Sequence, residues 1–271
     1  MLHVRDLRFQ LDDVPRDWHG GQVAISSFFD NLSLFFPAGE RFFVAAVRAH
    51  RHSVSDPEVA EAVRVFCAQE GIHGREHARY NEQLRRHGYP AQEMERRVAR
   101  LLRRVSRVTP RRWRLAATCA LEHFTALMAH LLLSNPRLLE GAHPQMAALW
   151  RWHAAEENEH KAVAFDVYQS AGGGYLERTG VMIAATVIFW AKVLEHQLRL
   201  MHSSGTLWSW REHWSLIRFL LLEPGGMGQL VWLYLDYFRP GFHPWDLDNR
   251  ELLEAWRREV QRTGLQPPAG A

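Results

Sequence analysis

Two predicted helices each contain the motif Glu-x-x-His, and this repeat limits the possible folds more than any other feature. One copy runs from Glu70 to His73 and the other from Glu157 to His160. Residues three or four positions apart lie on one face of an α-helix, so each motif directs a carboxylate and an imidazole to one point. His153 lies on the same stripe as Glu157 and His160. Both motifs therefore predict helices that present metal ligands.

Two further glutamates, Glu40 and Glu122, lie in apolar segments on either side of the first motif. A carboxylate on the apolar face of a helix is costly unless it is paired or binds a metal. The order Glu, Glu-x-x-His, Glu, Glu-x-x-His on four successive helices is the ligand set of ferritin-like dinuclear bundles. We therefore predict an all-α protein, a ferritin-like four-helix bundle with additional C-terminal helices. The predicted metal ligands are Glu40, Glu70, His73, Glu122, His153, Glu157 and His160.

The second motif leaves a choice between two neighbouring glutamates. Glu156 lies four residues before His160, and Glu157 lies three residues before it. We favour Glu157 because its spacing repeats that of Glu70 and His73, and Glu156 is then a partner close to the ligands. The alternative to a metal site is a helical bundle whose glutamates and histidines form solvated faces or buried ion pairs.

Three more residues are candidates for the surroundings of the site. His77 lies one turn beyond His73 and is expected to support a ligand, to face substrate or only to pack. Cys67 and Cys119 each precede a predicted ligand by three residues and suit small buried groups. The N-terminus has no apolar run of the signal-peptide type, so we expect a cytoplasmic protein without a structural disulfide.

Helix start and stop signals divide the chain into four segments. We expect an irregular N-terminal arm over residues 1–20, the metal-binding bundle over 21–174, apolar Trp-rich helices packed on it over 175–262, and a flexible tail over 263–271. Pro37 is expected to interrupt the first helix, with Glu40 in the turn after it. Proline at positions 57, 110 and 144 marks later helix starts, and Gly172 ends the fourth long helix.

The C-terminal third is rich in large apolar residues. The apolar run from Gly180 to Ala191 is too short to span a bilayer, so we expect a buried helix. The tryptophans that follow are expected to cap the bundle and wall a substrate pocket, with contact to a membrane surface as the alternative. The arginines between Arg96 and Arg114 lack the repeated aromatic interleaving that stacks bases, so we expect a solvated helix face and no nucleic-acid partner. No feature assigns an oligomeric state.

The donor types favour particular metals and chemistry. Carboxylate and imidazole suit iron and manganese, and we expect two iron ions, with manganese or zinc as alternatives. Such a centre is expected to activate dioxygen and oxidise a small, largely apolar substrate, with an external electron donor. The alternative is a hydrolase whose dinuclear centre activates water. A non-catalytic iron-binding protein is a second alternative.

Several segments resemble a known family. They are Pro37–Phe43, Gln69–His73, Ala120–Ala126, Glu156–Asp166 and Tyr237–Trp245. Together they resemble the predicted metal-dependent hydrolases, over most of the chain, and this resemblance implies metal binding. The spacing of His153 also resembles, more distantly, the para-aminobenzoate N-oxygenase type of di-iron enzyme, which implies a third nitrogen ligand to one iron.

Overall fold

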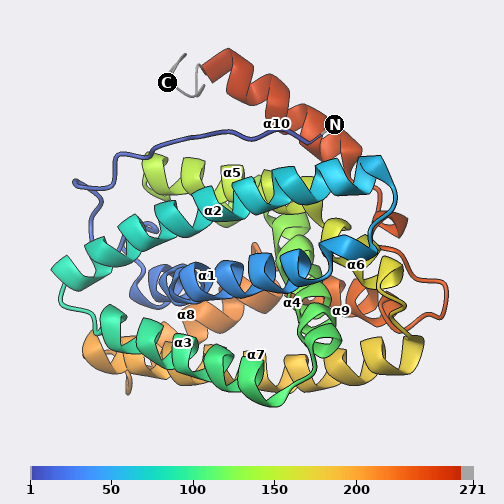
Figure 1. Ribbon diagram of the computed structural model, residues 1–271. Helices are drawn as coiled ribbons and strands as arrows, with labels where there is room; N and C mark the ends of the chain where they lie inside the picture. The colour runs from blue at the N-terminus through green and yellow to red at the C-terminus, as the bar shows by residue number, and fades with distance from the viewer. Residues whose placement is uncertain (1, 264–271) are drawn as a thin grey trace.

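The computed structural model describes residues 2–263, and helices account for most of that range (Figure 1). The four helices that carry the predicted ligands are α1 (Val23–Ala49), α2 (Pro57–Arg86), α4 (Arg111–Ser134) and α5 (Pro144–His160). The others are α3 (Ala91–Val108), α6 (Val163–Ser170), α7 (Tyr175–Ser203), α8 (Trp210–Ile217), α9 (Met227–Asp236) and α10 (Arg250–Thr263). Short 3₁₀ or π turns occupy Arg51–Ser53, Pro136–Leu139, Arg218–Leu222 and Pro244–Asp246.

The predicted all-α class is confirmed. In residues 2–263 the β-type pairing is limited to one isolated bridge, between His19 and Ala142. Figure 1 shows α1 in the middle of the molecule, with α2 and α5 on one side and α3 and α7 on the other. In this view α4 runs steeply across these helices, and α10 lies with the N-terminal arm along the edge beyond α2. The ferritin-like arrangement in detail stays a prediction.

The first helix is not interrupted at Pro37, contrary to expectation. A proline inside a helix removes the hydrogen bond to the carbonyl four residues earlier and costs about 3 kcal/mol. Here that carbonyl belongs to Ser33, and the Asn81 side-chain amide of α2 donates to it at 3.2 Å. The neighbouring helix thus supplies the missing donor. Glu40 consequently lies inside a continuous helix and not in a turn.

Other helix boundaries follow the sequence signals with two exceptions. The Asp56 side chain caps α2 by accepting from the Glu58 amide at 2.8 Å, as expected. At α4 the N-cap is Pro110, because the Thr109 hydroxyl donates back to the Val105 carbonyl of α3 at 2.7 Å.

The fourth predicted helix is also split, after His160, into α5 and α6. Lys161 lies in the two-residue turn between them, where its ammonium donates to the Asn249 side chain at 2.9 Å. Contact with a distant segment thus accompanies a break that local sequence did not indicate.

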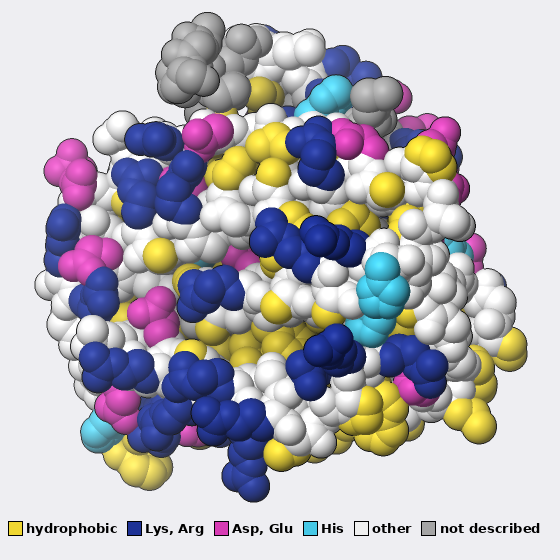
Figure 2. Space-filling view, viewed as in Figure 1, with side chains coloured by type: hydrophobic (Ala, Val, Ile, Leu, Met, Phe, Trp, Pro, Cys, Tyr) yellow, Lys and Arg dark blue, Asp and Glu magenta, His cyan; other side chains and the backbone are white. Residues whose placement is uncertain are grey.

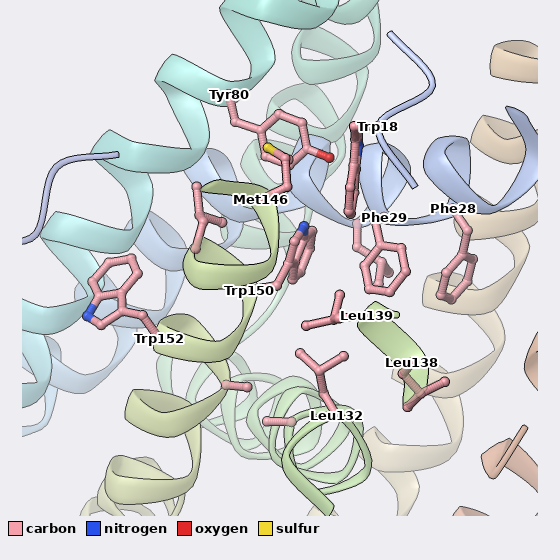
Figure 3. Packing of buried hydrophobic residues seen from close by; sticks show 14 of the residues in the cluster. Trp18, Phe28, Phe29, Tyr80, Leu132, Leu138, Leu139, Met146, Trp150 and Trp152 are labelled. Atoms are coloured by element: carbon pink, nitrogen blue, oxygen red, sulfur yellow. The ribbon is translucent and has the colours of Figure 1, made fainter. Parts of the chain in front are cut away.

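A cluster of large aromatic side chains packs beside the ligand helices (Figure 3). Figure 3 shows Trp18 from the N-terminal arm, Tyr80 from α2 and Trp150 from α5 converging on one another. The Trp18 indole and the Tyr80 hydroxyl both donate to one oxygen of Asp30, at 3.0 and 2.6 Å. The arm that was predicted to be irregular is therefore anchored by buried side chains of its own.

The C-terminal helices differ from the expected buried cap. α7 buries Met182, Val193 and Leu200 but leaves many apolar side chains on its other face exposed. The exposed members on α7 are Tyr175, Leu176, Ile183, Val187, Ile188, Leu194 and Leu198. By length and composition alone α4 and α7 are both able to cross a membrane, but the tested window is 72% buried in α4 and 22% buried in α7. The expectation that α7 is a buried helix is therefore wrong for one of its faces.

The predicted flexible tail begins at Thr263, which the structure places at the end of α10. The rest of that segment, residues 264–271, lies outside the described residues.

Asp30 is expected to make stability depend on pH. Burial raises the pKa of Asp30 to about 7, against the opposing hydrogen bonds from Tyr80 and Trp18. The unfolded chain therefore releases this proton first, and the contribution of Asp30 to stability is complete below about pH 4 and is lost as the pH rises through about 7. The wild-type free energy of unfolding should therefore decline between about pH 4 and 8, by about 1.4 kcal/mol for each unit by which the pKa of Asp30 is raised. We expect Asp30→Asn to flatten this decline.

Urea unfolding across this pH range measures the effect, with the exposed Asp13→Asn as a matched control. Parallel profiles for the wild type and Asp30→Asn would show that the Asp30 carboxyl is not perturbed.

Candidate metal centre

Four glutamates from four helices meet in the interior. Glu40 of α1, Glu70 of α2, Glu122 of α4 and Glu157 of α5 are 2%, 1%, 1% and 4% exposed. Glu40, Glu70 and Glu122 lie well inside their helices, Glu157 lies in the last turn of α5, and all four side chains are buried. The packing of these helices therefore concentrates acidic groups that would otherwise remain in water.

The predicted donors fall into three overlapping groups, and within each group the donor atoms lie within 4.8 Å of one another. The groups are Glu40 with His73 and His153, Glu70 with His73 and Glu157, and Glu70 with Glu122 and His160. Glu70 and His73 each belong to two groups, so the groups describe adjoining positions and not separate sites. The structure thus brings all seven predicted ligands together, and their role as ligands stays a prediction.

The carboxylates fit a cation because the protein leaves them unpartnered. Both carboxylate oxygens of Glu40, Glu70 and Glu122 are buried without a hydrogen bond, as is one oxygen of Glu157. Such groups cost about 1–3 kcal/mol each, and more when charged. Burial raises the pKa of Glu40 and that of Glu122 well above their ordinary values, and the charge of Glu70 raises both further. Metal ions would remove this penalty, so the donor set suits one or two of them.

Hydrogen bonds from outside the cluster orient two of the imidazoles. His160 Nδ1 donates a hydrogen bond to Gln69 Oε1 at 3.1 Å. The other ring nitrogen, Nε2, then faces Glu70 Oε1 at 3.1 Å. His73 Nε2 donates to Glu156 Oε2 at 3.0 Å, and its Nδ1 has no partner. Burial lowers the pKa of His73 well below its ordinary value, so the ring is neutral. His73 therefore presents one free lone pair, as a metal ligand must. Burial lowers the pKa of His160, but hydrogen bonds to Glu157 and Glu70 outweigh it and raise that pKa well above its ordinary value, so a metal ion would have to replace the proton on Nε2.

A chain of hydrogen bonds fixes His153 in the same way. The Ser33 hydroxyl donates to Asn81 Oδ1 at 2.7 Å and so accepts from His77 Nδ1 at 2.9 Å. His77 Nε2 then accepts from His153 Nδ1 at 2.6 Å. The remaining nitrogen, His153 Nε2, faces Glu157 Oε1 at 2.8 Å, where a proton or a metal ion is needed between them. The structure thus places His77 as the hydrogen-bond partner of His153.

Glu156 faces away from the donor groups. It accepts from His73 and, at 3.0 Å, from Arg5 of the N-terminal arm. Burial raises the pKa of Glu156 to about 7, and the charge of Arg5 opposes the shift. Arg5 also donates to both oxygens of Glu159, which lies beside Glu156 on α5. Glu157 belongs to a donor group and Glu156 to none, and the choice of Glu157 as the ligand stays a prediction.

The sequence did not single out Gln69, Arg5 or Gly74. Gln69 lies one turn before His73 on the inner face of α2, a position that helical spacing could have indicated. Arg5 gives no local signal, because only the path of the arm brings it to α5. A Cβ atom at Gly74 would lie 2.9 Å from Glu40 Oε2, so glycine makes room for that carboxylate.

The two cysteines do not belong to the donor groups. Cys119 is buried, Cys67 is half-buried, and both are free thiols. Burial raises the pKa of the Cys119 thiol well above its ordinary value, so it is an apolar packing group.

An inner cavity of about 70 Å³ adjoins one side of the cluster. His153 and Glu157 are the only predicted ligands in its wall, which is otherwise almost wholly apolar. The Phe36 ring, which also lines this cavity, packs against two histidines, with its centroid 4.4 Å from that of His153 and 4.5 Å from that of His77. The inner cavity therefore adjoins the cluster at His153 and Glu157.

The fold and the cluster define an all-α protein with buried carboxylate and imidazole groups that could hold a metal. A family model described as predicted metal-dependent hydrolase matches residues 3–248. The chain belongs to that family, as the sequence resemblance indicated. Comparison with curated proteins and with solved structures gave no match.

Replacement of Glu122 is expected to change metal binding and apoprotein stability in opposite directions. Glu122→Leu removes a carboxylate that a metal would need, so the ions retained per chain, measured by elemental analysis, should fall well below the wild-type value. It also removes a buried unpartnered group, so the free energy of unfolding of the chelator-treated variant should exceed that of the wild type by about 1–3 kcal/mol. Urea denaturation measures this difference. Exposed Glu61→Leu is the matched control. A variant that binds metal normally would exclude Glu122 as a ligand.

Replacement of His153 separates ligation from packing. If His153 is a ligand, His153→Ala should leave the protein folded and lower the metal content selectively, because both Glu-x-x-His pairs remain. His196→Ala is the control, since His196 is equally buried but stacks on Phe35 outside the cluster. Circular dichroism measures whether the variant is folded, and the metal-to-protein ratio measures its metal content. If the free energy of unfolding fell by about 1–3 kcal/mol while the metal content stayed unchanged, His153 would be a packing residue.

Proposed function

We propose that this protein is a metal-dependent hydrolase whose buried glutamates and histidines hold a dinuclear centre that activates water. The observation that carries the proposal is the set of unpartnered carboxylate oxygens of Glu40, Glu70 and Glu122 facing the three imidazoles. Family membership supports hydrolysis as the reaction class. Glu40, Glu70, His73, Glu122, His153, Glu157 and His160 would hold the ions, which when bound would lower the pKa of water and polarise a carbonyl group.

The protein's own residues supply orientation and a dry environment. Gln69, Glu156 and His77 each accept a hydrogen bond from one of the three histidines that would hold the ions, so the imidazoles are fixed before substrate arrives. The pair His77 and His153 can also hold and move a proton at the edge of the inner cavity, because their nitrogens lie 2.6 Å apart. The apolar wall excludes bulk water and so strengthens the electrostatic interactions inside.

Dioxygen activation is the second candidate. It is favoured by the donor set, which contains glutamate and histidine from helices, a combination that suits iron. It is also favoured by the apolar inner cavity, which suits an oxidisable apolar substrate. Family membership supports hydrolysis and gives no support to oxygen chemistry, so the alternative expected from the sequence becomes the main proposal.

Hydrolysis under argon separates the two candidates. We expect metal-reconstituted protein to cleave members of a panel of carboxylic esters and amides at the same rate with and without dioxygen. Chelation should abolish the activity, and stoichiometric manganese, zinc or ferrous iron should restore it. Glu122→Leu should be inactive and Glu61→Leu fully active. Product formation that requires both dioxygen and a reductant would overturn the hydrolase and support the second candidate.

A further inference from the structure

A second and larger cavity lies beside the site. It has a volume of about 530 Å³ and lies between α1, α3, α4 and α7. This is within the range of about 300–1,000 Å³ that ligand pockets occupy. Its two charged lining residues are already paired, Glu177 with Arg112 at 2.9 Å and Lys192 with Glu195 at 2.5 Å. The interior is therefore apolar, and it offers a ligand contact surface but few hydrogen bonds.

The outer cavity reaches the wall of the inner one. Leu32, Phe36, Thr125 and Met128 line both cavities. Phe36 also contacts the His153 ring, which lines the inner cavity together with Glu157. One layer of side chains thus separates the outer cavity from the inner one, whose wall contains His153 and Glu157. A substrate held in the outer cavity could place one end at the predicted ligands.

The opening and length of the outer cavity indicate the shape of its occupant. Leu176, Gly180, Ala184 and Ile188 follow one stripe of α7 and both line the cavity and reach the surface. The stripe continues to Lys192, a rise of about 24 Å at 1.5 Å per residue. Figure 2 shows a hydrophobic hollow in the middle of the viewed face, with lysine and arginine side chains on its borders. The cavity is thus long, apolar and open along one side, which suits a hydrocarbon chain better than a compact polar molecule.

We propose that the outer cavity binds the acyl chain of a long-chain ester and places the ester group at His153 and Glu157. The proposal rests on the hydrolase function and specifies its substrate class. In the reaction the bond between the acyl carbon and the alkoxy oxygen breaks. The acyl carbon gains the hydroxyl of water, and the departing alcohol gains the other proton, so no further reactant is needed.

Binding is tested without catalysis, on the full metal-free chain. The probe is a fluorescent long-chain fatty acid, displaced by hexadecanoate or by octanoate. We expect hexadecanoate to bind far more tightly than octanoate. The dissociation constant should fall by up to about fourfold for each added methylene group, because each one is removed from water. Because this cavity holds no predicted ligand, binding should persist after chelation. A failed hydrolase assay with intact binding would therefore count against the proposed function and not against the cavity.

Two variants fill the cavity from α7. Ala185→Phe places a ring in its wall, and Gly180→Leu adds a side chain where a Cβ atom meets no atom within 4 Å. Both should weaken hexadecanoate binding at least about tenfold while metal content stays at the wild-type value. The matched control is Gly228→Leu on α9, which also has open space at its Cβ atom but lies outside both cavities. Unchanged binding in both filled variants would overturn the proposal.

The same probe distinguishes the source of the chain. It is offered once from free solution and once from phosphatidylcholine vesicles. A transfer rate that rises with vesicle concentration supports uptake from a bilayer, to which the exposed apolar face of α7 is suited. Transfer at a rate independent of vesicle concentration supports uptake of the free molecule. Absence of binding from both sources would overturn the proposal.

Discussion

The main constraint on this structure is that it encloses four carboxylates with too few hydrogen-bond partners. Glu40, Glu70, Glu122 and Glu157 each come from a different helix, and packing these helices together forces like charges into a region without water. Such an arrangement opposes folding unless protons or cations neutralise it. A hydrophobic side chain at any of these positions would make a more stable helical protein. The retention of acids there is therefore best explained by metal binding, and the metal would contribute to the stability of the fold.

The residues around the donors limit the freedom of the predicted ligands. The imidazoles of His73, His153 and His160 each donate to a partner from another helix, which leaves one nitrogen directed inward. The partners are in turn anchored, Glu156 by Arg5 of the N-terminal arm and His77 by Ser33 of α1. The Asn81 side chain supports both the hydrogen-bond chain and the helix, because it donates to the carbonyl that Pro37 leaves without a donor. Site geometry and helix continuity thus share one residue.

Two cavities, separated by one layer of side chains, lie between this site and the exposed face of α7. On the arm's side, Trp18, Tyr80 and Trp150 form a closely packed aromatic cluster that leaves little space (Figure 3). Toward α3 and α7 the packing is looser, and the apolar residues of α7 are divided between a cavity wall and an exposed face. This asymmetry gives the molecule one closely packed side and one side that contains a large apolar cavity. It also explains why α7, unlike an ordinary core helix, leaves many apolar side chains exposed.

The sequence by itself determined the helical class, most helix boundaries and the seven acidic and imidazole groups that meet. It did so because helical periodicity and the cost of a buried carboxylate are both local properties. Tertiary structure alone decided what depends on contacts between distant segments. The continuity of α1 at Pro37 requires Asn81, the break after His160 accompanies contacts from residues 247–249, and the position of Glu156 requires Arg5. The exposure of α7 belongs to the same class, because a helix that is apolar on all sides does not reveal from its sequence which side has a neighbour.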